Sequence, residues 1–199
     1  MKMNLPNKLT MLRIILSIVI IILLLFPFHM VNIEFPTWQV EKIIVDSKYI
    51  IAGVIFIIAS ITDYFDGRLA RKYNLITDFG KMIDSIADKI LTNSVLIILS
   101  SAGFINPIIP VVIIVRDSIT NAIKMIAGSK GKVVSAIQTG RIKAACLMVG
   151  IVLMLFYNLP FELYNIKMAD FLLIIATILS LISGIQYYWM NRHLIFENN

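Results

Sequence analysis

Four aspartates in two closely spaced pairs are the residues of this chain best suited to binding a ligand or taking part in catalysis. Asp63 and Asp66 are three residues apart, and Asp84 and Asp88 are four apart, at or near the ends of strongly apolar segments. At about 100° per residue, either spacing places its two carboxylates on one side of a helix. Two such helices joined by a short turn can aim all four carboxylates at one point. Mutual repulsion opposes this unless cations lie between them, and hard oxygen ligands suit Mg²⁺ or Mn²⁺.

Small residues and an arginine accompany these acids. Gly67, Ala70 and Gly80 lie beside the aspartates on the same helix faces and leave room for a bulky ligand. Arg71, on the first of these faces, offers a planar set of donors to a phosphate. Carboxylates, metals, a cleft of small residues and an arginine together predict a substrate that carries a diphosphate.

The full pattern resembles that of the CDP-alcohol phosphatidyltransferase family: D-x-x-D-G-x-x-A-R from residue 63, then G-x-x-x-D-x-x-x-D from residue 80. The resemblance implies an enzyme that transfers the phosphatidyl group of CDP-diacylglycerol to an alcohol, with two divalent cations, Mg²⁺ or Mn²⁺, as cofactors. It implies a general base, Asp88, and four metal ligands, Asp63, Asp66, Asp84 and Asp88. It implies that the CDP-lipid is bound by Asp66, Gly67, Ala70, Arg71 and Gly80. It also suggests a homodimer.

The composition places the chain in a lipid bilayer. Hydrophobic residues make up 59% of the 199 residues and the mean hydropathy is +0.87, whereas soluble domains are about half apolar. The net charge is +6, but the basic residues do not gather in a soluble domain, so no nucleic-acid partner is expected. We therefore predict a single domain over residues 1–199, an all-α integral membrane bundle.

Six apolar segments are long enough to cross a bilayer, at about residues 12–28, 49–65, 82–100, 107–126, 135–156 and 169–190. Residues 6–13 are expected to form a short interfacial helix, with a simple basic flank as the alternative. Residues 29–48 are expected to form a loop. With the N-terminus inside, only three basic residues fall outside: Lys42, Lys48 and Lys167. This asymmetry predicts that both termini and the aspartates lie on the cytoplasmic side, and the resemblance implies a bacterial cell membrane.

A second set of charges belongs to the fourth and fifth segments. Arg116 and Asp117 lie deep in the fourth, where charge is costly and indicates function, although a buried structural pair is the alternative. Such cations suit an acceptor alcohol that carries its own phosphate. The order R-D in the fourth segment and G-R-x-K in the fifth resembles the bacterial branch of the family that makes phosphatidylglycerophosphate. This resemblance implies that sn-glycerol 3-phosphate is bound by Arg116, Lys124, Arg141 and Lys143.

Other acceptors remain open, because the chain departs from that branch at Asp117, at residues 121–124 and at Ala144. The alternatives within the family are phosphatidylinositol phosphate, phosphatidylserine and cardiolipin synthesis. Phosphatidylserine synthesis needs fewer cations, since its acceptor is zwitterionic. A small ion transporter is the alternative from another class. Transport favours acids near mid-membrane and interrupted helices, whereas these aspartates gather at one boundary.

Overall fold

Six long helices make up most of the described part of the chain. The computed structural model describes residues 5–41, 43–72, 78–130 and 137–196. Within these ranges, the side chains of residues 5–6, 64–72, 78–79, 81 and 193–196 are outside the description. The helices are α1 (Leu5–Leu25), α2 (Ser47–Lys72), α3 (Asp78–Ser101), α4 (Ile108–Ser129), α5 (Gln138–Leu155) and α6 (Met168–Phe196). The prediction of a helical bundle is confirmed for the described part of the chain.

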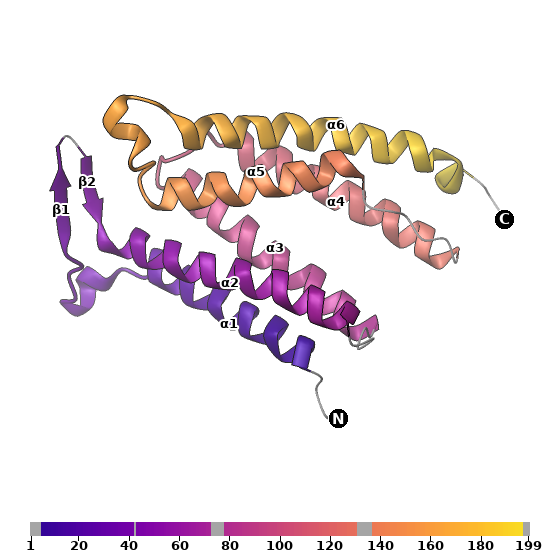
Figure 1. Cartoon of the computed structure of the whole chain (residues 1–199), viewed down its shortest axis with the longest axis horizontal. Helices are drawn as coiled ribbons and strands as arrows, with labels where there is room; N and C mark the ends of the chain where they lie inside the picture. Colours follow the sequence, from indigo (N-terminus) through magenta and orange to yellow (C-terminus); the bar gives the residue numbers. More distant parts are fainter. Residues whose placement is uncertain (1–4, 42, 73–77, 131–136, 197–199) are drawn as a thin grey trace.

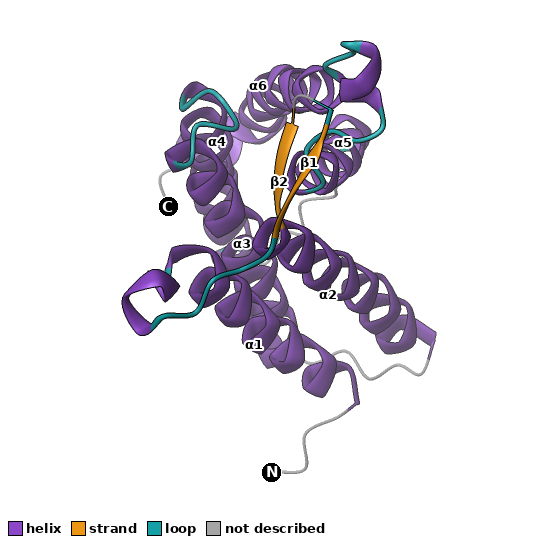
Figure 2. Cartoon of the chain, turned by 90° about the vertical axis from the view of Figure 1, so that its left-hand side faces the viewer, coloured by secondary structure: helices purple, strands orange, loops and turns teal. Residues whose placement is uncertain are grey.

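Successive helices run in alternating directions, so both chain ends lie at the same end of the bundle (Figure 1). The helices form two groups: α1 packs along α2 and α3, while α6 packs along α4 and α5. Contacts between the groups are fewer and involve mainly α2 with α5 and α3 with α4. Figure 2, which looks onto the hairpin end, shows α1 and α2 on one side and α4, α5 and α6 on the other.

Apolar side chains fill the helix contacts and also cover the outside. Ile20, Phe56 and Leu99 are fully buried between helices, whereas Val111 and Ile174 are at least half exposed on the outer faces of α4 and α6. An apolar exterior of this extent suits contact with lipid. Among the described residues, three stretches are long and apolar enough to cross a membrane by length and composition: Asn7–Leu25, Gln138–Leu155 and Met168–Arg192.

The separate interfacial helix expected at residues 6–13 is not present, because these residues are the first turns of α1. From Asn7 to Leu25 the sequence contains neither glycine nor proline, so nothing interrupts the helix. Pro6 lies in the first turn, where its missing N–H costs no intrahelical hydrogen bond. The amphipathic segment therefore continues directly into the apolar one.

The expected loop over residues 29–48 contains regular structure. A short 3₁₀ helix, η1 (Phe28–Val31), precedes an antiparallel hairpin of β1 (Thr37–Val40) and β2 (Ile43–Asp46). The strands are rich in β-branched and aromatic residues, which favour extended backbone. Glu41, at the connection, has a φ of 52°, the left-handed conformation that tight hairpin turns require.

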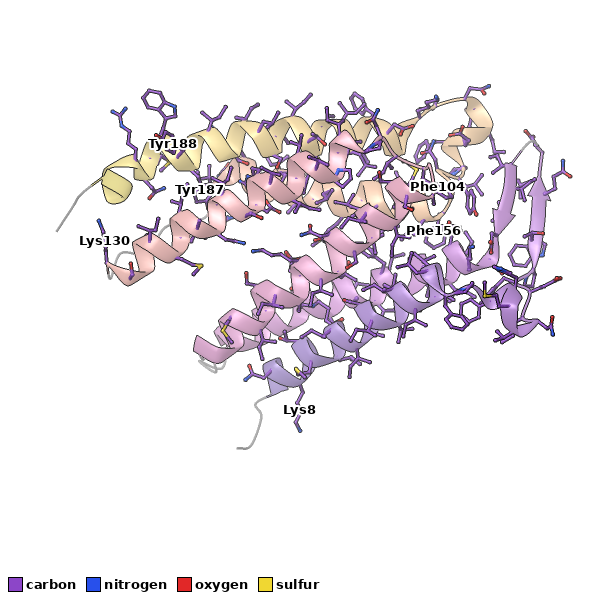
Figure 3. The ribbon with its side chains drawn as sticks, turned by 180° about the vertical axis from the view of Figure 1, so that it is seen from behind. Lys8, Phe104, Lys130, Phe156, Tyr187 and Tyr188 are labelled. Carbon is purple, nitrogen blue, oxygen red and sulfur yellow. The ribbon has the colours of Figure 1, made fainter. Side chains whose placement is uncertain are left out.

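An aromatic cluster joins the two helix groups at the hairpin end. The ring of Tyr49 lies 4.8 Å from Phe104 and 5.9 Å from Tyr157, which follows α5 and precedes a 3₁₀ helix, η2 (Phe161–Tyr164). The phenol oxygen of Tyr157 accepts a hydrogen bond from the backbone N–H of Asp46, and burial raises its pKa. Figure 3 shows Phe104 near this end, with Lys8 and Lys130 near the other. The groups are thus tied together away from the chain termini.

Candidate active site

One aspartate of each predicted pair is brought together by an arginine from α1. Nη1 of Arg13 lies 2.5 Å from Oδ1 of Asp63 on α2 and 3.0 Å from Oδ1 of Asp84 on α3. The same nitrogen contacts both oxygens, so Arg13 bridges the two carboxylates. The Arg13 side chain is fully buried, while those of Asp63 and Asp84 are 35% and 49% exposed. The carboxylates therefore keep an open side for a ligand.

The position of Arg13 follows from the buried face of α1. The residues of that helix with little or no exposure are Thr10, Arg13, Ser17, Ile20 and Leu24. Their spacing of three and four residues forms one stripe that faces α2 and α3. The hydroxyl of Ser17 donates a hydrogen bond of 2.7 Å to the backbone oxygen of Arg13. The stripe is polar from Thr10 to Ser17 and apolar at Ile20 and Leu24. Arg13 lies in its polar part, at the level of the aspartates of α2 and α3.

Asp88 lies one helical turn beyond Asp84 on α3. Its carboxylate interacts electrostatically with those of Asp63 and Asp84, and with Arg13. We call Asp63, Asp84 and Asp88 the acidic cluster. Gly80 lies on the same helix, one turn before Asp84. The acidic cluster thus draws on α2 and α3, with its positive partner supplied by α1.

Four further predicted residues lie on the last turns of α2: Asp66, Gly67, Ala70 and Arg71. Their backbone is helical, which places Asp66 close to one turn beyond Asp63. Their side chains lie outside the described residues, so their roles stay predictions.

A second cluster lies on the other helix group. Nζ of Lys143, on α5, lies 2.8 Å from Oδ1 and 3.0 Å from Oδ2 of Asp117 on α4. Nη1 of Arg116 donates to the same Oδ1 at 2.8 Å. We call Arg116, Asp117 and Lys143 the basic cluster, since two cations share one carboxylate. Asp117 and Lys143 both interact electrostatically with Asp88, so charges of the two clusters lie within electrostatic reach of each other.

Arg116 also fastens α4 to α6. Its Nε donates to the backbone oxygen of Ser180 at 3.2 Å, and its Nη2 donates to Oγ of Ser183 at 2.6 Å. A Cβ atom on Gly184 would lie 2.9 Å from Cγ of Arg116, so the helices approach closely at this glycine. These contacts fit the structural alternative for the Arg116–Asp117 pair.

The other two predicted acceptor cations are exposed. The ammonium of Lys124 lies 5.6 Å from the ring centre of Tyr187, and the guanidinium of Arg116 lies 5.7 Å from the same ring. Lys124 is thereby placed near the basic cluster. Arg141 is exposed on α5, half a turn from Lys143. The structure therefore gathers Arg116, Lys124 and Lys143 in one region of the second helix group.

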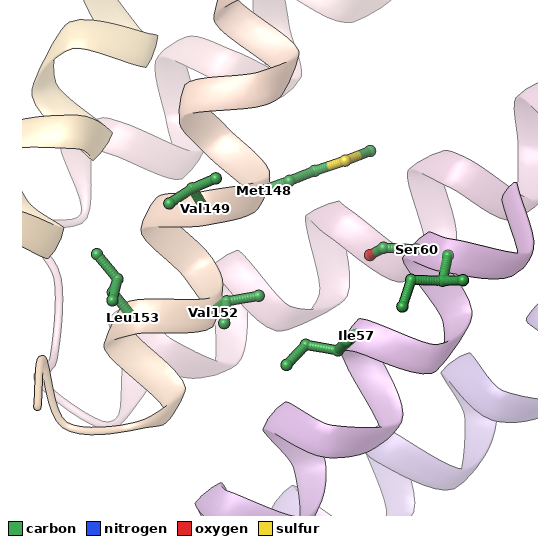
Figure 4. A pocket seen from close by; sticks show the side chains of 7 residues that line it. Ile57, Ser60, Met148, Val149, Val152 and Leu153 are labelled. Carbon is green, nitrogen blue, oxygen red and sulfur yellow. The ribbon is translucent and has the colours of Figure 1, made fainter. Parts of the chain in front are cut away.

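An apolar groove of about 550 Å³ runs between α2 and α5 (Figure 4). It is lined by Ile57, Ser60, Ile61, Met148, Val149, Val152 and Leu153. Ser60 lies one turn before Asp63 on α2. The groove therefore lies within about one helical turn of Asp63, the residue that α2 contributes to the acidic cluster.

Divalent cations match the donor chemistry of the acidic cluster. Carboxylate oxygens are the ligands that Mg²⁺ and Mn²⁺ prefer, and a buried guanidinium already lies between two of these oxygens. Within the described residues, no three acidic, histidine or cysteine side chains are grouped closely enough to hold a metal ion. The side chain of Asp66 is not among those described.

The chain matches known proteins over nearly its whole length. Residues 3–186 match the family model of CDP-alcohol phosphatidyltransferase. A Bacillus subtilis protein named CDP-diacylglycerol–glycerol-3-phosphate 3-phosphatidyltransferase is 35% identical over 196 residues, which cover 98% of this chain and 99% of its own length. A Rickettsia typhi protein of the same name is 32% identical over 186 residues, covering 93% and 95%.

A solved structure shares the fold. The apo form of phosphatidylinositol phosphate synthase from Mycobacterium tuberculosis aligns with a TM-score of 0.60 over 97% of this chain and 93% of its own. The two sequences are 17% identical, so this likeness concerns the fold alone.

Proposed function

This chain belongs to the CDP-alcohol phosphatidyltransferase family, and we propose that it transfers the phosphatidyl group of CDP-diacylglycerol to sn-glycerol 3-phosphate. The products are phosphatidylglycerophosphate and CMP, in phospholipid biosynthesis. The observation that carries the proposal is the meeting of Asp63 and Asp84 at one buried cation, with Lys143 of the basic cluster interacting electrostatically with Asp88. The names of the nearly full-length relatives support glycerol 3-phosphate as the acceptor.

The protein is proposed to cross a bacterial cell membrane six times. Three helices, α2, α3 and α4, contain no stretch among the described residues that is apolar enough to be assigned as a membrane span. Their lengths of 22 to 26 residues are nevertheless similar to those of the other three helices, and all six run in alternating directions. Helices of this length in one antiparallel bundle cross the same layer. Most lysine and arginine residues fall on one side of the proposed spans, which supports a cytoplasmic location for both termini and the acidic cluster. The homodimer implied by the family stays a prediction.

The lipid substrate is proposed to lie across the boundary between bilayer and water. Its acyl chains follow the groove between α2 and α5, beside Val149 and Ser60. Its cytidine diphosphate extends to the ends of α2 and α3. There the CMP portion is held by Asp66, Gly67, Ala70, Arg71 and Gly80. This arrangement brings a soluble acceptor and a membrane-bound donor to one place.

The acidic cluster and Asp66 are proposed to hold two divalent cations, Mg²⁺ or Mn²⁺. When bound, such cations neutralise the diphosphate and stabilise the CMP that leaves. Asp88 accepts the proton of the acceptor hydroxyl, whose oxygen then forms a bond to the β-phosphorus. The bond from that phosphorus to the oxygen of CMP breaks. Because a carboxylate is a weak base toward an alcohol, Asp88 must also orient the hydroxyl closely.

The acceptor phosphate is proposed to be bound by Arg116, Lys124, Arg141 and Lys143. Lys143 is the best placed of these, since it interacts electrostatically with Asp88 and lies opposite the acidic cluster. Arg116 donates to Asp117 and to α6 through three of its five N–H groups, so it can bind the phosphate without giving up these partners. An uncharged acceptor would leave this excess of positive charge without a counter-ion.

The experiment that tests the function is a CMP-release assay on the purified protein in lipid–detergent micelles. CDP-diacylglycerol is supplied with one acceptor at a time: glycerol 3-phosphate, serine, inositol phosphate or phosphatidylglycerol. We expect CMP release with glycerol 3-phosphate and only background release with the others. Efficient use of another acceptor would move the chain to another branch of the family, and no release with any of the four would contradict the proposal.

A further inference from the structure

Arg13 contacts two carboxylates of the acidic cluster from α1, and the proposed reaction gives it no role. An arginine with no exposed surface costs free energy unless carboxylates balance its charge. Asp63 and Asp84 provide that balance directly, and Asp88 provides it at longer range. Arg13 is therefore the internal counter-ion of the acidic cluster.

The contacts of Arg13 engage atoms that a metal would need. Its Nη1 lies against Oδ1 of Asp63 and Oδ1 of Asp84, and the proposed function assigns both carboxylates to divalent cations. A cation held by these two carboxylates would lie next to the guanidinium. Two positive groups at such a distance repel each other, so they compete for the same oxygens.

Resting on the proposed function, we propose that Arg13 is a displaceable counter-ion. It holds the carboxylates of α2 and α3 together in the metal-free enzyme and releases them when divalent cations bind. Its freed guanidinium then turns to the diphosphate of the nucleotide-activated lipid, an anion that suits its planar set of donors. The backbone oxygen of Arg13 accepts a hydrogen bond from the Ser17 hydroxyl. The proposed exchange of partners therefore moves the Arg13 side chain and leaves the α1 backbone in place.

This role differs measurably from a purely structural one. If Arg13 only held the helices in place, its removal would loosen the carboxylates and weaken metal binding. If it competes with the metal, its removal leaves the carboxylates without a counter-ion, and divalent cations bind more tightly. Turnover falls in either case, because the diphosphate loses a donor or the site loses its order. The direction of the change in metal affinity therefore separates the two roles.

The test compares Mn²⁺ binding to the chelator-stripped wild type, Arg13→Gln and Arg13→Lys, measured by the electron paramagnetic resonance signal of free Mn²⁺. We expect Arg13→Gln to bind Mn²⁺ about tenfold more tightly, within the usual range for coupled neighbouring sites. Arg13→Lys keeps the charge and should stay close to the wild type. The matched control is Arg192→Gln, which removes an exposed guanidinium stacked 4.7 Å from the Trp189 ring on α6 and should leave Mn²⁺ affinity unchanged.

The outcomes are distinct. Tighter Mn²⁺ binding by Arg13→Gln, together with reduced CMP release, supports the proposal. Equal or weaker binding overturns it while leaving the proposed function intact. If the wild type binds no Mn²⁺, the metal site of the proposed function fails, and this inference with it. Should the glutamine variant not fold, Arg13→Met fills the buried space without a charge and carries the same expectation.

Discussion

Lys143 and Asp117 join α5 to α4 through an ion pair in which Nζ contacts both carboxylate oxygens, at 2.8 and 3.0 Å. The Lys143 side chain is only 7% exposed. Because Arg116 donates to the same carboxylate, two cations share one anion, and the basic cluster keeps an excess of positive charge. Lys143 also interacts electrostatically with Asp88, and we propose that the phosphate of the acceptor lies between these two residues.

Lys143→Gln is therefore expected to weaken binding of glycerol 3-phosphate. The loss of one charge-assisted contact of about 1.5–3 kcal/mol corresponds to a rise in the acceptor KM of roughly tenfold to a hundredfold. The KM for CDP-diacylglycerol should change little. Steady-state kinetics with each substrate varied in turn measures both values. Lys167→Gln, at an exposed lysine just before α6, is the control, and an unchanged acceptor KM in Lys143→Gln would remove this residue from the acceptor site.

Removal of divalent cations is expected to abolish activity. The carboxylates of the acidic cluster repel one another, and one guanidinium does not neutralise three of them. After EDTA treatment, CMP release should fall to background, and added Mg²⁺ or Mn²⁺ should restore it. Ca²⁺, which favours more ligands at longer distances, serves as the comparison. Full activity in metal-free buffer would contradict the proposed cation site.

Asp88→Asn is expected to reduce turnover with little effect on lipid binding. Asparagine keeps the size of the side chain but cannot accept the proton of the acceptor hydroxyl. A general base contributes a factor of about 10² to 10⁴, so kcat should fall by that range. Binding of CDP-diacylglycerol can be followed by its protection against thermal unfolding. A variant that lost this protection yet kept its turnover at saturating lipid would show that Asp88 binds the lipid and is not the base.

The aspartate pairs were predictable because their geometry is local. A spacing of three or four residues sets a shared helix face, so each aspartate pair could be predicted from the sequence. The structure brings Asp63 and Asp84 together through α1, which packs along both α2 and α3 and places Arg13 between the two carboxylates. The hairpin over residues 37–46 was missed, because Pro36 and the mixed charges around it favoured a loop over two four-residue strands.

Arg13 was not predicted as a site residue because its partner is far along the chain. Asp84 lies 71 residues away, and no spacing rule connects residues on different helices. The sequence did contain a signal, since Arg13 is in phase with Ser17, Ile20 and Leu24 on one helix face. A position on the same helix face as the apolar residues Ile20 and Leu24 indicates that the Arg13 guanidinium is buried, and a buried charge requires a partner of opposite charge. It does not say which acid provides it.

Gly184→Leu is expected to destabilise the protein without removing any charged group. α6 and α4 are so close at Gly184 that an added Cβ atom would lie only 2.9 Å from Cγ of Arg116. A leucine side chain must therefore push α6 away from α4. Overpacking of this kind costs about 1–3 kcal/mol. The melting temperature in detergent should fall relative to the wild type. Gly128→Leu, where an added Cβ meets nothing within 4 Å, is the control, and equal melting temperatures in the two variants would contradict the close contact.

The last prediction concerns the groove between α2 and α5. Val149 lines it and is half exposed, so Val149→Trp places a large ring where the acyl chains of CDP-diacylglycerol are proposed to lie. We expect a severalfold higher KM for the lipid and an unchanged KM for glycerol 3-phosphate. Ile178→Trp, at a half-exposed position on α6 that does not line the groove, controls for the effect of an added tryptophan on the apolar surface. If both variants kept the wild-type KM for the lipid, the acyl chains would have to lie elsewhere. If both raised it equally, the effect would come from the bilayer-facing surface and not from the groove.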